Sequence, residues 1–265
     1  MVREFENKDY WAIVLGGSSG LGLASALKLA EHGMNVCIVH RDRRVDLAKI
    51  EGQFERIKDN HVQFISFNVD GLKSENLAMI LKSLKERMGE KGKVRTFIHS
   101  VAKGHLKAMV DTEESTLSTE DFHLTIDAMA VSLYLWTKAI FDSSMFSSDA
   151  RILAFTSEGN SKAWPNYGAV SAAKAALEAI SRNIALEFAP FGLRSNCIQA
   201  GVTDTASFRM IPNSKAIKEY TLKRNPFKRL TTPEDVADAV YLLCKVEAAW
   251  INGAIIPVNG GEHIS

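Results

Sequence analysis

Short apolar runs alternate with amphipathic segments along the whole chain. Seven runs have the composition of buried strands: Trp11–Gly16, Asn35–His40, Val62–Val69, Val94–Ser100, Arg151–Thr156, Leu193–Ile198 and Ala254–Val258. Four segments show helical spacing or helix start signals: Gly22–His32, Asp121–Phe141, Val170–Phe188 and Pro233–Leu243. For the last of these we expect Thr232 to be the N-cap, because Thr-Pro-Glu-Asp is a typical helix start.

This alternation predicts an α/β fold with a parallel sheet, because each return to a parallel strand requires a crossover connection. The continuous apolar strands indicate burial on both faces of the sheet. We therefore expect a Rossmann-type doubly wound parallel sheet of about seven strands, with helices on both faces. No repeat or linker divides the sequence, so residues 1–265 are interpreted as one domain. Ligands of such folds bind at the carboxyl ends of the strands.

Composition and charge exclude several other classes of protein. Hydrophobic residues make up 46% and charged residues 24%, and the net charge of +1 favours neither a nucleic-acid nor a membrane partner. Cys37, Cys197 and Cys244 stand far apart among apolar neighbours and are expected to be buried. The seven histidines show no pairing at helical spacing, so no metal site is expected. No leader and no apolar run of about 18 residues is found, and a cytoplasmic location is the default expectation.

A glycine-rich turn follows the first predicted strand. The segment Leu15-Gly-Gly-Ser-Ser-Gly-Leu-Gly22 joins this strand to the first helix. Glycines allow the backbone to approach a pyrophosphate, and the free N–H groups at a helix start point toward it. The segment therefore predicts a dinucleotide site.

The end of the second strand indicates which dinucleotide binds. An acidic residue there would bind the ribose 2′-hydroxyl of NAD. Here the sequence is His40-Arg-Asp-Arg-Arg44, and a guanidinium group matches the geometry of a 2′-phosphate. Arg41 is the first candidate, with Arg43 or Arg44 behind it, so NADP(H) is preferred. NAD(H) remains the alternative if Asp42 points inward.

The spacing Gly16-x-x-x-Gly20-x-Gly22 resembles the short-chain dehydrogenase/reductase superfamily, and the resemblance extends from about Tyr10 to Glu262. Leu15 departs from it, since the family usually has Thr there. The resemblance implies the following cofactor-binding residues: Gly16, Ser18, Ser19, Gly20, Leu21, Gly22, Arg41, Asn68, Val69, Ser100, Val101, Ala102, Lys174, Gly201, Val202, Thr203 and Thr205.

The catalytic pattern departs from the usual Tyr-x-x-x-Lys. Val170 stands four residues before Lys174, and the nearest tyrosine is Tyr167. Seven residues are about two helical turns, so Tyr167 and Lys174 share a face at about 10 Å along the axis, compared with about 6 Å for the usual spacing. Tyr167 is expected just before the helix, where Lys174 acidifies it less. Lys174 is expected to reach the nicotinamide ribose.

Tyr-x6-Lys resembles the enoyl-acyl carrier protein reductases of this superfamily. His99-Ser-Val-Ala102, Pro165-Asn-Tyr167 and Ala200-Gly-Val-x-x-Thr205 are similar to segments of that group. His99 itself is expected to be structural. The Asn of ketoreductases is absent, because its position falls at about Met129. The subgroup with the ordinary glycine motif has a serine at the position of Ser157. The resemblance thus implies Tyr167, Lys174 and Ser157 as catalytic residues.

The implied reaction is reduction of an enoyl thioester in fatty acid synthesis by NADPH. The acyl group would be carried by acyl carrier protein or coenzyme A. The segment 203–222 is expected to be the substrate lid, and members commonly form homotetramers. The alternatives are an alcohol dehydrogenase or ketoreductase of the 3-oxoacyl or hydroxysteroid type, and a catalytically silent NADP-binding protein.

Overall fold

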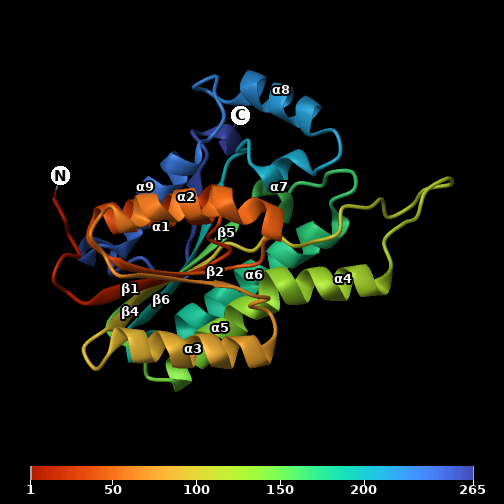
Figure 1. Cartoon of the computed structure of the whole chain (residues 1–265). Coiled ribbons are helices and arrows are strands. Elements are labelled where there is room, and N and C mark those ends of the chain that lie inside the picture. The colour runs from red at the N-terminus through yellow and green to blue at the C-terminus, as the bar shows by residue number, and fades with distance from the viewer. Residues whose placement is uncertain (1, 265) are drawn as a thin grey trace.

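The computed structural model describes residues 2–264 and has a seven-stranded parallel sheet between two layers of helices (Figure 1). The strands are β1 (Tyr10–Leu15), β2 (Asn35–His40), β3 (Phe64–Asn68), β4 (Lys93–His99), β5 (Phe146–Thr156), β6 (Leu193–Ala200) and β7 (Ile255–Val258). Their order in the sheet is β3-β2-β1-β4-β5-β6-β7. The sheet thus reverses its winding between β1 and β4, and the prediction of a Rossmann-type doubly wound fold is confirmed.

Helices cover both faces of the sheet (Figure 1). One face carries α1 (Gly20–Glu31), α2 (Leu47–Lys58) and α9 (Pro233–Cys244), and the other carries α3 (Ser74–Met88), α4 (Thr119–Ile126), α5 (Ser132–Asp142) and α6 (Gly168–Glu187). Side chains of β1 alternate between the two cores: Ile13 and Leu15 join one hydrophobic cluster, and Ala12 and Val14 join the other. The apolar run of β1 is therefore explained by burial on both sides.

Most predicted elements are found within a few residues of their expected bounds. Thr232 caps α9 as expected, because its side chain accepts a hydrogen bond from the backbone N–H of Asp235. The three cysteines are buried, also as expected. The sequence prediction omitted α2 and α3. In α2 the buried residues Ile50, Phe54 and Ile57 form a narrow stripe among charged residues, so the periodic signal was weak.

One continuous helical segment, Thr119–Asp142, contradicts the expectation that no stretch of the chain is long and apolar enough to cross a membrane. It has 24 residues, and an 18-residue window within it has a mean hydropathy of 1.3 and is half buried. Trp136 and Leu133 pack in the protein core, which is the arrangement of an interior helix. A π-helical turn, Asp127–Val131, interrupts the segment between α4 and α5.

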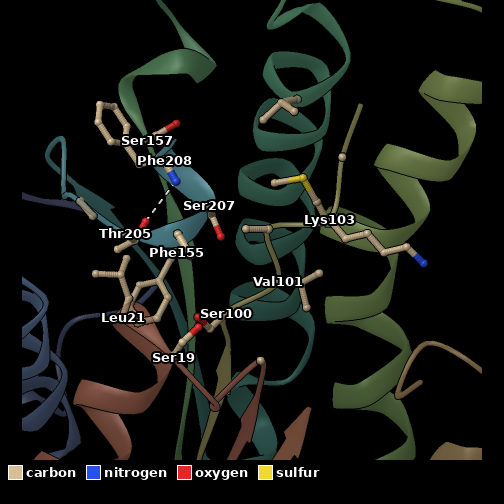
Figure 2. Close-up of a pocket in the computed structure, with 18 of the residues that line it drawn as sticks. Ser19, Leu21, Ser100, Val101, Lys103, Phe155, Ser157, Thr205, Ser207 and Phe208 are labelled. Carbon is tan, nitrogen blue, oxygen red and sulfur yellow. Dashed lines mark hydrogen bonds between the residues drawn. The ribbon is translucent and has the colours of Figure 1, made fainter. Parts of the chain in front are cut away.

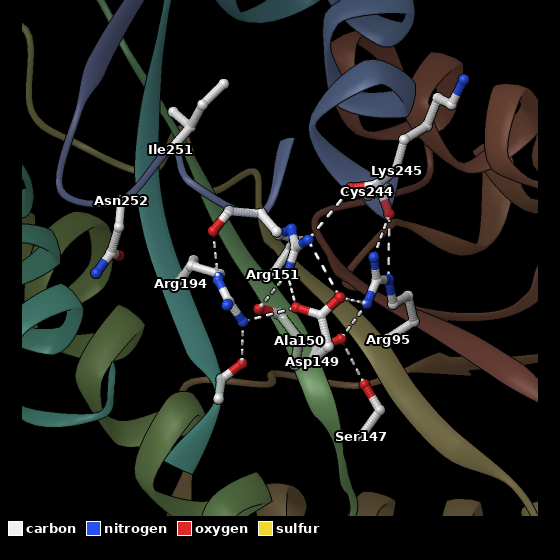
Figure 3. A network of polar contacts seen from close by, with 12 residues as sticks. Arg95, Ser147, Asp149, Ala150, Arg151, Arg194, Cys244, Lys245, Ile251 and Asn252 are labelled. Atoms are coloured by element: carbon white, nitrogen blue, oxygen red, sulfur yellow. Dashed lines mark hydrogen bonds and ion pairs between the residues drawn. The ribbon is translucent and has the colours of Figure 1, made fainter. Parts of the chain in front are cut away.

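A cluster of arginines joins the sheet to the C-terminus of α9 (Figure 3). Arg95, Arg151 and Arg194 stand on neighbouring strands and all pair with the carboxylate of Asp149, at nitrogen–oxygen distances of 2.5–2.6 Å. Arg95 and Arg151 also donate to backbone carbonyls at the C-terminus of α9, at Leu243 and Cys244. The last carbonyls of a helix receive no hydrogen bond from within the helix, so the arginines satisfy them. Their positive charges also interact favourably with the negative, C-terminal end of the helix dipole.

Candidate active site

A pocket of about 750 Å³ lies at the carboxyl ends of the strands. Two short helices, α7 (Ala206–Arg209) and α8 (Ser214–Arg224), contribute lining residues, among them Ser207 and Phe208 of α7 (Figure 2). Every cofactor residue proposed from the sequence lines this pocket, except Gly22 and Asn68. The three proposed catalytic residues, Ser157, Tyr167 and Lys174, line it as well. The fold therefore brings together residues that are far apart in the sequence.

The glycine turn packs too tightly for side chains. Gly16 has a φ of +87°, and a Cβ there would lie 2.3 Å from the backbone oxygen of Ser100. A Cβ at Gly22 would lie 2.3 Å from the backbone oxygen of Gly16, so Gly22 supports the turn from behind. Ser19 precedes α1 and its side chain makes no capping bond to the described helix. The first N–H groups of α1 are therefore free to bind a phosphate, which supports the dinucleotide site.

The ends of β2 and β3 form the adjoining wall of the pocket. The guanidinium group of Arg41 is 65% exposed and pairs with Asp70 at 2.8 Å. The carboxylate of Asp42 is 2.8 Å from His40 Nδ1. Asn68 exchanges hydrogen bonds with the backbone of Asp42, so its amide fixes this turn rather than lining the pocket. The guanidinium group of Arg41 is thus accessible to a ligand despite its pair with Asp70, whereas the carboxylate of Asp42 is paired with the buried His40.

Tyr167 is the N-cap residue of α6, as expected from its spacing to Lys174. Its ring packs on Gly159, where a Cβ would overlap it. Burial raises the pKa of the phenol, and the neighbouring Ser157 hydroxyl opposes that increase. Ser157 Oγ is buried, and no protein atom in residues 2–264 satisfies it with a hydrogen bond of ordinary geometry. The Tyr167 phenol and the unsatisfied Ser157 hydroxyl therefore lie together at the pocket.

Lys174 lies deeper in the same wall. Its ammonium group is 2.6 Å from the backbone oxygen of Phe155, to which it donates. Burial lowers the pKa of Lys174 to about 8, and the nearby Cys197 and Glu178 oppose this decrease. Glu178 itself accepts hydrogen bonds from Thr156 and Asn160. The lysine is therefore a buried cation at the floor of the site. The pKa of Tyr167 is shifted by burial and by Ser157, not by Lys174.

Met129 lines the pocket and the buried His99 lies behind its wall, and neither supplies acid–base chemistry. His99 is buried beside Ser132, with 2.7 Å between Nε2 and Oγ, and burial lowers its pKa to about 3. The ring is therefore neutral at physiological pH, in line with the structural role expected for it. Met129 belongs to the π-helical turn. Both Met129 and Val170 line the pocket. The described floor thus has apolar side chains at the two positions where ordinary family members place polar ones.

Sequence reasoning missed several residues of the pocket wall, namely His40, Asp70, Glu158, Trp164 and Glu262. Asp70 lies two residues after the end of β3, so its place at the carboxyl edge of the sheet was available as a signal. Glu262 comes from the last residues of the chain and accepts a hydrogen bond from the backbone N–H of Val202, 60 positions away. No local pattern predicts such a contact, because only the docking of the C-terminal turn creates it.

Comparison with known proteins agrees with this geometry. The family model described as enoyl-(acyl carrier protein) reductase matches residues 16–263. A short-chain type dehydrogenase/reductase of Picea abies is 28% identical, over 95% of this chain and 91% of its own length. A 1-cyclohexenylcarbonyl-CoA reductase of Streptomyces collinus is 26% identical, over 96% and 86%.

The enoyl-[acyl-carrier-protein] reductase [NADH] of Aquifex aeolicus is 33% identical in sequence, over 69% of this chain and 68% of its own. Its crystal structure superimposes with a TM-score of 0.82 at 25% identity, over 98% of each chain. The chain therefore belongs to the enoyl-(acyl carrier protein) reductase family of the short-chain dehydrogenases/reductases, and it is an oxidoreductase that uses a nicotinamide dinucleotide.

Proposed function

We propose that this protein reduces the carbon–carbon double bond of an enoyl thioester with NADPH, as an enoyl-acyl carrier protein reductase does. One observation carries the proposal: Tyr167 and Ser157, whose hydroxyl groups are neighbours, line the pocket together with the apolar side chains of Val170 and Met129. Reduction of a double bond needs a group that stabilises charge on the thioester oxygen. It does not need the proton relay of a carbonyl reductase, so apolar residues at those positions are compatible with it.

Each residue of the site has a different role in the proposed reaction. When bound, the reduced nicotinamide supplies a hydride to the β-carbon of the substrate. Tyr167 donates a hydrogen bond to the thioester oxygen as negative charge develops there, an interaction worth about 3 kcal/mol in comparable oxyanion sites. Ser157 supports the same oxygen or orients the phenol. Lys174 adds positive potential at the floor and holds the ribose hydroxyls, and the α-carbon takes its proton ultimately from solvent.

The wall formed by β2 and β3 supports NADPH. The ion pair of Arg41 with Asp70 is exposed, and such pairs contribute only about 0–1 kcal/mol. A 2′-phosphate therefore displaces Asp70 from Arg41 at little cost. Asp42 is held by His40 and is a poor partner for a ribose hydroxyl. The Aquifex relative is named as an NADH enzyme, so cofactor choice has to be measured for this chain.

The second candidate is a carbonyl reductase acting on a 3-oxoacyl or other ketone. The unsatisfied Ser157 hydroxyl beside Tyr167 favours it, because that pair suits a carbonyl oxygen equally well.

In either case we propose a cytoplasmic homotetramer. Apolar side chains are exposed on β7 and on the neighbouring end of α6, including Ile255 and Leu186, and Trp250 is 97% exposed.

The deciding experiment follows NADPH oxidation with crotonyl or trans-2-octenoyl thioesters and, separately, with the matching 3-ketoacyl thioesters. Acyl carrier protein and coenzyme A are compared as carriers, and NADH is run in parallel. We expect turnover of the enoyl substrates with NADPH. Turnover of the keto substrates alone would select the second candidate, and NADPH binding without any turnover would favour a silent binding protein.

A further inference from the structure

One buried guanidinium group joins three separate parts of the pocket wall. Arg224 ends α8, and its side chain is 7% exposed. Its Nη2 lies 2.5 Å from Glu158 Oε2 and 2.8 Å from Glu262 Oε1. Glu158 follows Ser157 directly, whereas Glu262 comes from the C-terminal turn. A single nitrogen therefore ties the helix above the pocket to the loop that carries a proposed catalytic residue.

The network continues on both sides of Arg224. Glu262 uses its other carboxylate oxygen to accept a hydrogen bond from the backbone N–H of Val202, in the segment after β6. Glu158 also pairs with Lys162, in the loop that leads to Tyr167. The two carboxylates are 12% and 2% exposed, so water screens them little from the guanidinium between them. Arg224 is thus the cation shared by both buried carboxylates.

A second contact couples the same two segments. The ring of Tyr220, one turn before Arg224, packs edge-on against Trp164, with 6.4 Å between ring centroids. Trp164 lines the pocket in the loop between Glu158 and Tyr167. Further along α8 and α7, Ile217 and Phe208 also line the pocket. A movement of α8 would therefore change the apolar wall and the Ser157 loop together.

We propose that Arg224 is a positioning residue that fixes α8 over the pocket and links the place of this helix to the loop carrying Ser157 and Tyr167. The lid predicted for segment 203–222 is then followed, two residues after its end, by a buried ionic anchor rather than by a free hinge. This inference rests on the proposed function for its kinetic consequences. Its structural consequence, the anchoring of α8, does not depend on which substrate is reduced.

The first test is limited proteolysis by chymotrypsin, with cleavage at Phe208 and Tyr220 located by mass spectrometry. Arg224→Met removes the cation, which leaves the buried Glu262 carboxylate without its ion pair and Glu158 with only the partly exposed Lys162. We expect cleavage in α7 and α8 to accelerate by at least about tenfold, since breaking a buried ion pair leaves uncompensated charge. Arg229→Met is the matched control, because Arg229 makes an exposed pair with Asp235 outside these helices. Equal cleavage rates in the two variants would overturn the proposal.

Arg224→Lys tests whether charge or shape is required. Both ion pairs use one nitrogen of Arg224, so a lysine ammonium has the chemistry to replace it. We expect Arg224→Lys to restore most of the protection that Arg224→Met loses. If Arg224→Met does not fold, Glu158→Gln removes the charge that pairs with Arg224 and Lys162 while keeping the pair of Arg224 with Glu262, and we expect a smaller acceleration in the same direction. Unaltered protection in a folded Glu158→Gln would contradict a link to the Ser157 loop.

Kinetics separate positioning from general stability. At a temperature well below unfolding, we expect Arg224→Met to raise KM for the enoyl thioester by about tenfold or more and to leave the dissociation constant of NADPH within about twofold, because the loosened lid wall contacts the acyl group. A lower melting temperature with unchanged KM would show a merely structural role. If the wild type reduces no enoyl thioester, the proposed function fails, but the proteolysis result still decides the anchoring role.

Discussion

The ammonium nitrogen of Lys174 donates a hydrogen bond to the backbone oxygen of Phe155, 2.6 Å away, in the floor of the pocket. Tyr167 stands two turns earlier, at the start of the same helix. The two side chains therefore occupy different levels of the pocket, the lysine near the strand ends and the tyrosine nearer the rim. This separation follows from the six residues between them, and it underlies the first two predictions.

Tyr167→Phe removes the phenol hydroxyl and keeps the ring. We expect kcat for enoyl reduction to fall by about 100-fold or more, the usual effect of losing an oxyanion donor, with a much smaller change in the KM for NADPH. Steady-state kinetics with trans-2-octenoyl thioester measure both. Tyr134→Phe, at an exposed tyrosine on α5, is the matched control. An unchanged kcat in Tyr167→Phe would remove Tyr167 from the proposed role.

Lys174→Met should stabilise the protein at neutral pH while impairing its activity. The pKa of Lys174 is about 8 in the folded state, compared with an ordinary value of 10.5, because burial penalises the ammonium group. This difference corresponds to a cost of up to about 3 kcal/mol below pH 8. Between pH 8 and 10.5 Lys174 binds more protons in the unfolded state than in the folded state. The free energy of unfolding of the wild type therefore rises with pH in this window, as the cost of the buried charge disappears.

The advantage of Lys174→Met should therefore be largest at pH 7 and shrink toward pH 10. Urea unfolding at several pH values measures it. Lys138→Met is the control, because Lys138 is exposed and paired with Asp142 on the surface. A destabilised Lys174→Met at pH 7 would mean that the hydrogen bond to Phe155 outweighs the cost of burial.

Arg41→Ala should weaken the use of NADPH and spare that of NADH. The guanidinium group is exposed at the pocket and held only by a surface pair with Asp70. Loss of a charge-assisted bond to a 2′-phosphate costs about 1.5–3 kcal/mol, so we expect kcat/KM for NADPH to fall by at least about tenfold. Arg43→Ala is the comparison, since Arg43 is 84% exposed on the same turn. Equal losses with both cofactors would argue against recognition of a 2′-phosphate.

Asp149→Asn should destabilise the fold without acting on the pocket. Burial of Asp149 disfavours its charge, but hydrogen bonds from Arg151 and Arg95 outweigh this and hold its pKa at about 2. The variant leaves two buried guanidinium groups without a counter-charge, and such losses cost about 3 kcal/mol or more. Chemical denaturation at pH 7 measures the cost, with Asp238→Asn as the control, because the Asp238 side chain is 60% exposed in its pair with Lys28.

The same carboxylate predicts a pH dependence. Because the folded pKa of Asp149 lies below its ordinary value of 3.8, its contribution is complete above about pH 4 and is lost as the pH falls toward 2. The difference in unfolding free energy between the wild type and Asp149→Asn should therefore narrow in that window. A constant difference from pH 7 to pH 2 would contradict the assignment.

The order of elements, the glycine turn, the cap at Thr232 and the place of Tyr167 before its helix could all be predicted from the sequence, because each depends on residues close together in the chain. Periodicity determined the strands because β1 and its neighbours are buried on both faces, and seven parallel strands admit few arrangements. The charged surfaces of α2 and α3 concealed their narrower apolar stripes.

Tertiary structure alone decided which charges meet. Arg41 with Asp70, three arginines with Asp149, and Arg224 with Glu158 and Glu262 join residues that are mostly tens of positions apart. It also decided that Asp42 is engaged by His40, and that Lys174 is buried deeply enough to lower its pKa. Local sequence determines propensity and hydrophobic pattern, whereas burial and charge pairing depend on how distant segments pack, which no short stretch of the chain encodes.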